Sequence, residues 1–192
     1  MEGRPRRAAL RSMTTTPSWR MFCAIELPPE VRARLQDHVA RLRKDVPDVA
    51  ASWTRVDNIH LTLKFFGDVA VDRIETISRE LDRAVKGFSP FEISVGKAGV
   101  FRSQVLWIGV SDPSGKLEEL HQKVGKEDRD YRPHLTIARI RHRDGAKHLV
   151  DSHLQMKFDQ TSIRVTELIL FRSELSPKGS RYTAISNHGL HG

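Results

Sequence analysis

A tetrapeptide of alternating polar and apolar residues occurs twice in this chain of 192 residues, and it constrains the fold more than any other feature. The two copies are His60-Leu61-Thr62-Leu63 and His134-Leu135-Thr136-Ile137. Alternation with a period of two is typical of a β-strand that buries one face. Each copy therefore predicts a half-buried strand that presents an imidazole and a hydroxyl on one side and aliphatic side chains to the core on the other.

Helix and strand patterns alternate around the two motifs. Apolar residues spaced three and four apart predict helices over 30–46, 71–85, 116–124 and 146–154. Strands are expected over 19–27, 52–56, 59–66, 91–100, 104–110, 134–140, 156–165, 167–175 and 181–186. This order predicts a mixed α/β or α+β domain. The motifs lie 74 residues apart, each at the start of a strand that precedes a helix, which suggests two related lobes.

Composition narrows the class of protein. The chain is long enough to bury a core without disulfides, and its single cysteine, Cys23, excludes a disulfide framework and favours a reducing compartment. We therefore expect a cytoplasmic protein. No apolar run approaches the roughly 20 residues that a membrane helix needs, so no membrane association is expected.

Residues 1–18 differ from the rest of the chain. They hold Arg4, Arg6, Arg7 and Arg11 with few aliphatic residues, and they predict a disordered basic tail ahead of one two-lobed domain over 19–192. Two alternatives are an RNA-binding arm and a true start at Met13. The net charge of +8 leaves about +5 for the body without the tail, which suits a phosphate or RNA partner without proving one.

The paired motifs have the residue types that phosphoester cleavage needs. Two residues along a strand span roughly 6.5–7 Å, so His60 and Thr62 could hold opposite sides of a small anion, and His134 and Thr136 repeat the arrangement. If the strands lie side by side, two imidazoles that share one proton near neutral pH can act as general base and general acid. The threonines would orient the phosphate oxygens. No metal or other cofactor is required.

Two other interpretations remain open at this point. A histidine on a half-buried strand is often a polar residue with a purely structural hydrogen bond. Two histidines could also be zinc ligands, but a third ligand of similar quality is missing: the other candidates are His142, His148 and His153 in a polar stretch and Asp68 beyond a turn.

At these residues the chain resembles the 2H phosphoesterase superfamily, and within it the RNA 2′,3′-cyclic phosphodiesterases, also called 2′-5′ RNA ligases. The resemblance runs from about residue 20 to 187. It is carried by three segments in the same order: Arg20-Met21-Phe22-Cys23-Ala24-Ile25, Asn58-Ile59-His60-Leu61-Thr62-Leu63-Lys64-Phe65-Phe66-Gly67, and Arg132-Pro133-His134-Leu135-Thr136-Ile137-Ala138-Arg139.

The resemblance implies a two-lobed α+β fold with pseudo-two-fold related halves, antiparallel sheets lining a central cleft and helices outside. It implies hydrolysis of an RNA 2′,3′-cyclic phosphate end to a 2′-phosphomonoester, with 2′-5′ ligation as the reverse reaction. His60 would be the proton donor to the departing 3′ oxygen and His134 the base that activates water, while Thr62 and Thr136 hold the phosphate. The expected partner is such an RNA end or a small cyclic nucleotide, bound by a monomer.

Three further residues are weaker candidates for substrate contacts. By the resemblance Arg139 would contact phosphate, but it lies five residues after His134, so strict alternation puts it on the opposite face unless a bulge intervenes. Phe22 and Tyr182 could stack on a base. Phe65 and Phe66 are adjacent and cannot share a face, so one of them should be core. The rival functions are an RNA or nucleotide binding module with little catalysis and a 2H phosphodiesterase for another small cyclic phosphate.

Overall fold

The computed structural model describes residues 16–125, 131–142, 144–177 and 179–192. Most of the predicted basic tail therefore lies outside the described residues. The elements are β1 (Ser18–Ile25), α1 (Pro29–Asp45), β2 (Ala51–Trp53), η1 (Val56–Asn58), β3 (Leu61–Ala70), η2 (Val71–Arg73), α2 (Ile74–Val85), β4 (Phe91–Phe101), β5 (Val105–Ser111), α3 (Lys116–Gly125), β6 (His134–Ile140), α4 (Ala146–Gln155), β7 (Thr161–Val165), β8 (Glu167–Ser176) and β9 (Gly179–Gly189).

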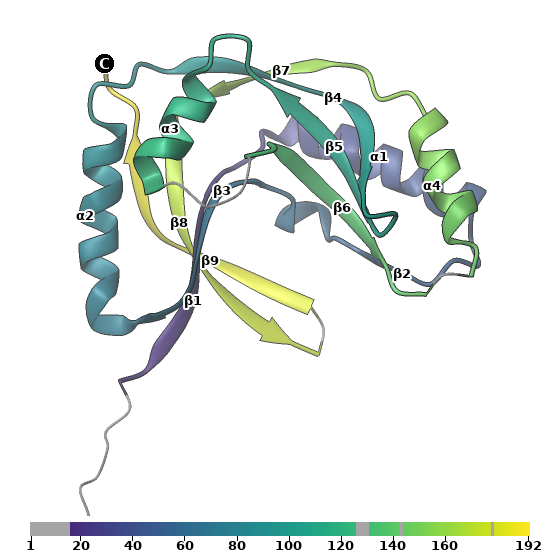
Figure 1. Cartoon of the computed structure of the whole chain (residues 1–192), viewed down its shortest axis with the longest axis horizontal. Coiled ribbons are helices and arrows are strands. Elements are labelled where there is room, and N and C mark those ends of the chain that lie inside the picture. The colour runs from purple at the N-terminus through teal and green to yellow at the C-terminus, as the bar shows by residue number, and fades with distance from the viewer. Residues whose placement is uncertain (1–15, 126–130, 143, 178) are drawn as a thin grey trace, which may run out of the picture.

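The strands form two antiparallel sheets, which confirms the predicted α+β class. Sheet A has the order β3-β1-β8-β9, and sheet B has the order β2-β6-β5-β4-β7. Figure 1 shows α2 and α3 beside sheet A, and α1 and α4 on the side of sheet B. Each sheet carries one of the two motif strands, β3 at the edge of sheet A and β6 next to the short edge strand of sheet B. The predicted pairing of two lobes is thus built as two sheets with one motif each.

Several strands differ from their predicted limits. β3 begins at Leu61, one residue after His60, and it continues through Gly67 instead of ending there. Gly67 has a positive φ of 71° and sits at a register shift against β1, so it bends the strand without closing it. The extended piece expected over 52–56 is a three-residue strand followed by a turn of 3-10 helix, and β7 starts at Thr161 rather than at Met156.

The main hydrophobic core is continuous and takes side chains from both sheets and all four helices. A second, smaller cluster lies on the other face of sheet A and consists of Phe22, Ala24, Ile169 and Phe171, with Tyr182 packed against it. Successive residues of β1 alternate between the two clusters, because strand side chains point to opposite faces. Sheet A is therefore apolar on both faces near its centre, and the second face carries the motif histidine.

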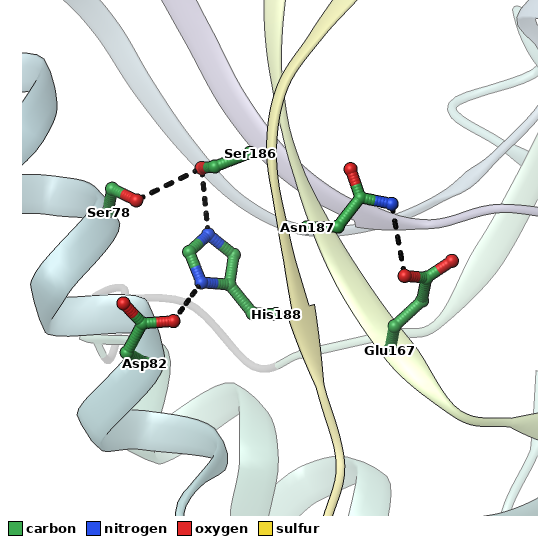
Figure 2. Close-up of polar contacts among 6 residues, drawn as sticks. All are labelled: Ser78, Asp82, Glu167, Ser186, Asn187 and His188. Atoms are coloured by element: carbon green, nitrogen blue, oxygen red, sulfur yellow. Dashed lines mark hydrogen bonds and ion pairs between the residues drawn. The ribbon is translucent and has the colours of Figure 1, made fainter.

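A chain of polar contacts fastens α2 to β9 on the core side of sheet A (Figure 2). His188, which is 2% exposed, donates from Nδ1 to the carboxylate of Asp82 at 2.6 Å. Its Nε2 lies 2.9 Å from the hydroxyl of Ser186, which in turn accepts a hydrogen bond from Ser78 at 3.2 Å. Since every polar group of the buried imidazole has a partner, the helix can pack on the sheet without leaving an unsatisfied donor.

A buried histidine pair joins α1 to α4. His38 Nε2 lies 3.1 Å from His153 Nδ1, and both rings are fully buried. His153 Nε2 donates to the carbonyls of Gly99 and Trp107, so its Nδ1 must accept from His38. Nδ1 of His38 then has no hydrogen-bond partner among the described residues. Burial, with the nearby His153 and Arg41 adding to it, lowers the pKa of His38 to about 4.

This pair should make the fold sensitive to acid. The folded pKa of His38 lies below its unfolded value of about 6.5, so the unfolded state binds the proton more tightly and stability falls as the pH drops from about 6.5 toward 4. We expect His38 to cost about 2 kcal/mol of unfolding free energy at pH 5 relative to pH 7.5. Urea unfolding of the wild type and of His38→Gln at both pH values measures this, since glutamine keeps the donor but does not titrate. An equal loss of unfolding free energy in both proteins would mean that groups other than His38 cause the acid sensitivity.

Candidate functional site

His60 is held by a backbone carbonyl two residues before it. Its Nδ1 lies 2.8 Å from the carbonyl oxygen of Asn58. A carbonyl only accepts, so Nδ1 carries the hydrogen and Nε2 of the neutral ring keeps its lone pair. The Asn58 side chain donates to the carbonyl of Ser180 at 2.7 Å, which ties the segment before β3 to the start of β9. The ring of His60 is thus oriented with Nε2 as its reactive atom.

His134 repeats this arrangement in the other sheet. Its Nδ1 lies 2.7 Å from the carbonyl oxygen of Arg132, again two residues earlier. The intervening Pro133 accepts a hydrogen bond from the backbone of Val110, which fixes the entry to β6. Both motif histidines therefore have the same tautomer and present Nε2 for chemistry.

Aromatic rings support His60. Phe22 stacks on it with centroids 4.7 Å apart and a 25° interplanar angle, and Tyr182 meets it edge-on at 5.3 Å. Phe22 is only 2% exposed and also stacks on Phe171 at 5.2 Å. The expectation that Phe22 stacks on a base is therefore corrected: its faces are covered by protein, and it supports the histidine instead. Tyr182 is half-buried and keeps part of its ring at the surface.

Rings also surround His134. Phe101 meets it edge-on at 4.9 Å and Trp107 lies at 6.4 Å, with Phe101 and Trp107 in contact with each other at 5.0 Å. Trp107 in turn covers Gly99 on the neighbouring strand, its partner in the ladder. The position of His134 therefore depends on how the hairpin of β4 and β5 packs.

A β-bulge in β6 decides where Arg139 points. Trp107 pairs with Thr136, and Leu106 pairs with Ala138, so Ile137 is an extra residue in the ladder. Ile137 and Ala138 are both buried, and Arg139 returns to the exposed face of His134 and Thr136. The sequence placed Arg139 on this face only if a bulge intervened, and the structure has that bulge. The positive charge of Arg139 acts on the imidazole of His134, which is consistent with this placement.

β3 has a bulge at the equivalent position. Ala24 pairs with Thr62 and Cys23 with Lys64, so Leu63 is the extra residue. Phe65 then lies on the face of Thr62, opposite Phe22, and is 58% exposed. Phe66 packs against the main core, as expected for one of the two phenylalanines.

The bulge in β3 is covered by α3 and by the segment that leads into β6. The carbonyl of Leu63 lies 2.9 Å from Nδ1 of His121 in α3, and the carbonyl of Thr62 accepts from the hydroxyl of Tyr131 at 3.2 Å. Tyr131 and His121 stack at 4.0 Å. These contacts cap an edge strand that would otherwise expose its carbonyls. They also connect the segment that leads into β6 with the strand of the first motif.

The two threonine hydroxyls are available to a ligand. Thr62 and Thr136 are half-buried, and each lies on the same face as the histidine of its motif. Within the part of the chain that the structure describes, no hydrogen bond to another side chain or to the backbone occupies either hydroxyl. A bound anion could therefore receive both without breaking an existing contact.

The motif histidines act on each other electrostatically. β3 and β6 belong to different sheets but contact each other, and a charge on His134 disfavours a charge on His60. Burial lowers the pKa of His60 to about 4, against the hydrogen bond to Asn58, which raises it; Arg32 and His134 lower it further. The pKa of His134 is lowered as well, by burial and by Arg139. Both shifts favour the neutral imidazoles in the free protein over the shared proton that the residue types suggested.

Arg32 is a residue of the site that sequence reasoning missed. It lies in the first turn of α1, where its Nε donates to the carbonyl of Leu27 at 2.8 Å and its guanidinium lies 3.4 Å from Glu26. From there its charge reaches His60. No motif marks it, because the contact depends on where the helix begins relative to a strand some thirty residues away.

The other histidines and acids do not assemble around the motif pair. Among the described residues no three His, Cys, Asp or Glu side chains form a group that could hold a metal ion, and His153 is engaged with His38. In the same residues no helix is long and apolar enough to cross a bilayer. The arrangement is suited to proton transfer at an anion placed between two neutral imidazoles.

Comparison with known proteins identifies the family. Residues 27–177 match the profile of the 2′-5′ RNA ligase superfamily. The chain belongs to this superfamily. A relative from Methanothermobacter thermautotrophicus, named RNA 2′,3′-cyclic phosphodiesterase, is 37% identical over 180 residues, which are 85% of this chain and 95% of the relative.

Solved structures of the 2′-5′ RNA ligase superfamily share the fold. Escherichia coli LigT in its apo form superposes with a TM-score of 0.72 at 26% identity, over 92% of this chain and 99% of LigT. LigT complexed with 3′-AMP gives a TM-score of 0.71 at 26% identity, over 91% and 99% of the two chains. The expected family and its two-sheet α+β fold are both confirmed.

Proposed function

We propose that this member of the superfamily hydrolyses 2′,3′-cyclic phosphate ends of RNA to 2′-phosphomonoesters with its two motif histidines and without a metal. The observation that carries the proposal is the pair of imidazoles with the same backbone-fixed tautomer, one in each sheet. The name of the 37% identical relative supports the substrate class. Because one chain supplies both histidines, the catalytic unit is a monomer.

The mechanism assigns one proton transfer to each histidine. Nε2 of His134 removes a proton from water, and the resulting hydroxide attacks phosphorus. The bond from phosphorus to the 3′ oxygen breaks, and Nε2 of His60, protonated in the complex, donates its proton to that oxygen. Thr62 and Thr136 donate hydrogen bonds to the non-bridging oxygens, and Arg139 balances their charge. The assignment of acid and base follows the superfamily resemblance.

Binding of the substrate phosphate explains how His60 can become protonated before it acts as the acid. His60 starts neutral because burial, Arg32 and His134 disfavour its charge. A phosphate anion beside the ring reverses the sign of the local field and favours the imidazolium. His60 would therefore take up its proton as the substrate binds, so that the acid is charged only when there is an oxygen to protonate.

Product analysis tests the proposed function. A short RNA with a 2′,3′-cyclic phosphate end should give a 2′-phosphate and a free 3′ hydroxyl, and the rate should be unchanged by a chelator. A 3′-phosphate product would place the histidines on the wrong sides of the phosphate. Binding of a nucleoside 2′-phosphate without turnover would favour a binding module, and faster turnover of ADP-ribose 1″,2″-cyclic phosphate would favour another small cyclic substrate.

The pH dependence should reflect the electrostatics of the free site. Profiles of kcat/KM report the free enzyme, so we expect a bell whose maximum lies below pH 6.5, because both histidine pKa values are lowered. Arg32→Gln removes a cation that lowers the pKa of His60, and it should move the limb of the profile that is set by the pKa of His60 to higher pH. Arg34→Gln, an exposed cation on the same helix, serves as the control and should leave the profile in place. Identical shifts in both variants would show a general charge effect.

A further inference from the structure

Two side chains from outside the motifs hold consecutive carbonyls of the first motif strand. His121 of α3 is 3% exposed and its Nδ1 lies 2.9 Å from the carbonyl oxygen of Leu63, while the hydroxyl of Tyr131 donates to the carbonyl of Thr62 at 3.2 Å. The two rings stack with centroids 4.0 Å apart and an interplanar angle of 10°. We propose that Tyr131 and His121 are positioning residues, which together form a clamp that sets the spacing of the two motifs.

The bulge at Leu63 supplies one of the two carbonyls. The ladder between β3 and β1 skips this residue, so its backbone is left out of the regular pairing. A carbonyl only accepts, so His121 donates to it from Nδ1. Because the bulge decides which residues of β3 face the site, a donor that binds the bulged carbonyl also stabilises the face on which Thr62 lies.

Tyr131 connects the clamp to the second motif. It directly precedes Arg132, whose carbonyl holds Nδ1 of His134 at 2.7 Å. One hydrogen bond from Thr62 to Tyr131, one step along the backbone and a second hydrogen bond therefore lead from the first motif to the second histidine. Thr62 lies in sheet A and His134 in sheet B, so this path joins the two sheets that carry the motifs.

The hydroxyl of Tyr131 remains a donor at the pH of catalysis. Burial raises its pKa above the usual value of about 10, and the nearby Glu118 and Cys23 raise it further. The phenol therefore stays protonated and keeps its hydrogen bond to Thr62. Removing this hydroxyl changes how the strands are held and leaves the charge of the site as it was.

The spacing of the motifs matters because the reaction needs both histidines at one phosphate. This inference rests on the proposed function, in which His134 activates water on one side of phosphorus and His60 protonates the 3′ oxygen on the other. One half-site is sufficient to bind the substrate, but the transition state is stabilised only when both rings are in place. Loss of the clamp should therefore lower kcat and leave KM unchanged.

Tyr131→Phe removes the hydroxyl and keeps the ring that stacks on His121. With adenosine 2′,3′-cyclic phosphate we expect kcat to fall about 10-fold, less than the roughly 10²-fold that a shift of about 1 Å can cost, because His121 still holds Leu63. Ser78→Ala is the matched control, since it also removes a hydroxyl that joins two elements, α2 and β9. It should lower the unfolding free energy as Tyr131→Phe does, but its kcat should equal that of the wild type.

Two substitutions test the contribution of His121. His121→Phe keeps a ring against Tyr131 but removes the donor to Leu63, and kcat should again fall about 10-fold. His121→Asn loses the ring but places an amide N–H near the position of Nδ1, so it should recover part of this loss. If His121→Asn were no faster than His121→Phe, the bond to Leu63 would not position the motif, and the clamp would be wrong.

A transition-state analogue provides a measurement that needs no turnover. The cyclic ester of adenosine with vanadate has five-coordinate vanadium and resembles the phosphorus of the transition state. Tyr131→Phe should bind this ester about 10-fold more weakly, in step with kcat, and should bind adenosine 2′-phosphate as tightly as the wild type.

The outcomes separate the clamp from the proposed function. A wild-type kcat in Tyr131→Phe, or a loss of kcat equal to that in Ser78→Ala, would overturn the clamp. If the wild type turned over no cyclic phosphate, the proposed hydrolysis would fail. The ratio of the two affinities, for the vanadate ester and for adenosine 2′-phosphate, would then decide: a lower ratio in Tyr131→Phe supports the clamp and an equal ratio overturns it.

Discussion

Alanine in place of His60 or His134 is expected to lower turnover of an RNA 2′,3′-cyclic phosphate by roughly 10²- to 10⁴-fold, the usual contribution of a positioned acid or base. In the proposed mechanism each ring supplies one of the two proton transfers, and its Nδ1 is committed to a backbone carbonyl, so no second nitrogen can substitute. The double variant should be little worse than either single one, because groups that act in one step are not additive. Single-turnover rates on a short RNA measure this directly.

The loss must be separated from unfolding. His60 stacks on Phe22 and His134 contacts Phe101, so both variants also lose ring packing. Urea unfolding should nevertheless show a cooperative transition in each. His142→Ala, which removes an exposed imidazole outside both motifs, is the matched control and should retain full turnover. Wild-type rates in either motif variant would rule out the two-histidine mechanism.

The second large effect is expected from a single methyl group at Gly99. A Cβ built there falls among the ring carbons of Trp107, far inside any real contact distance. Gly99→Ala must therefore displace the indole, which packs against Phe101 and lies beside His134. We expect the unfolding free energy to fall by about 1–3 kcal/mol and kcat to fall by up to about 10²-fold, because a catalytic group moved by about 1 Å can lose that much.

A suppressor and a control make this test specific. Gly99→Ala combined with Trp107→Leu makes room for the methyl group and should recover part of the stability. Gly96→Ala lies on the same strand, but its Cβ would meet only Gln160 at 3.3 Å, so it should be much milder. If Gly99→Ala and Gly96→Ala behaved alike in unfolding and in turnover, the indole would have no role in placing His134.

The order of helices and strands could be predicted because periodicity is a local property. Val31, Leu35, Val39 and Leu42 mark one face of α1, and all four are buried. The predicted end of a strand was wrong where pairing with another strand extends it. β3 continues past Gly67 because β1 still pairs with it there. Gly67 itself has a positive φ, which glycine adopts without strain. The sequence of β3 alone does not indicate how far β1 will pair with it.

Strand alternation was the part of the sequence pattern that could predict the site. It places Thr62 with His60 and Thr136 with His134, which the structure also does. It places Arg139 on the wrong face, because the bulge at Ile137 has no glycine or other local signal. Arg32 and the burial of Phe22 depend on contacts between distant segments, and so does the low pKa of His60.

The bulges also bear on how two half-sites of common design can come to differ. In both strands the bulge leaves the motif sequence unchanged and alters only the face on which the residue five positions after the histidine lies. Phe65 and Arg139 therefore face the site, while the two motifs remain alike. After a gene duplication, such a pair of halves need not alter its histidines or threonines to become directional. One substitution per half, at the position five residues after the histidine, is then enough to give two similar anion-binding motifs a site that binds its ligand in one direction.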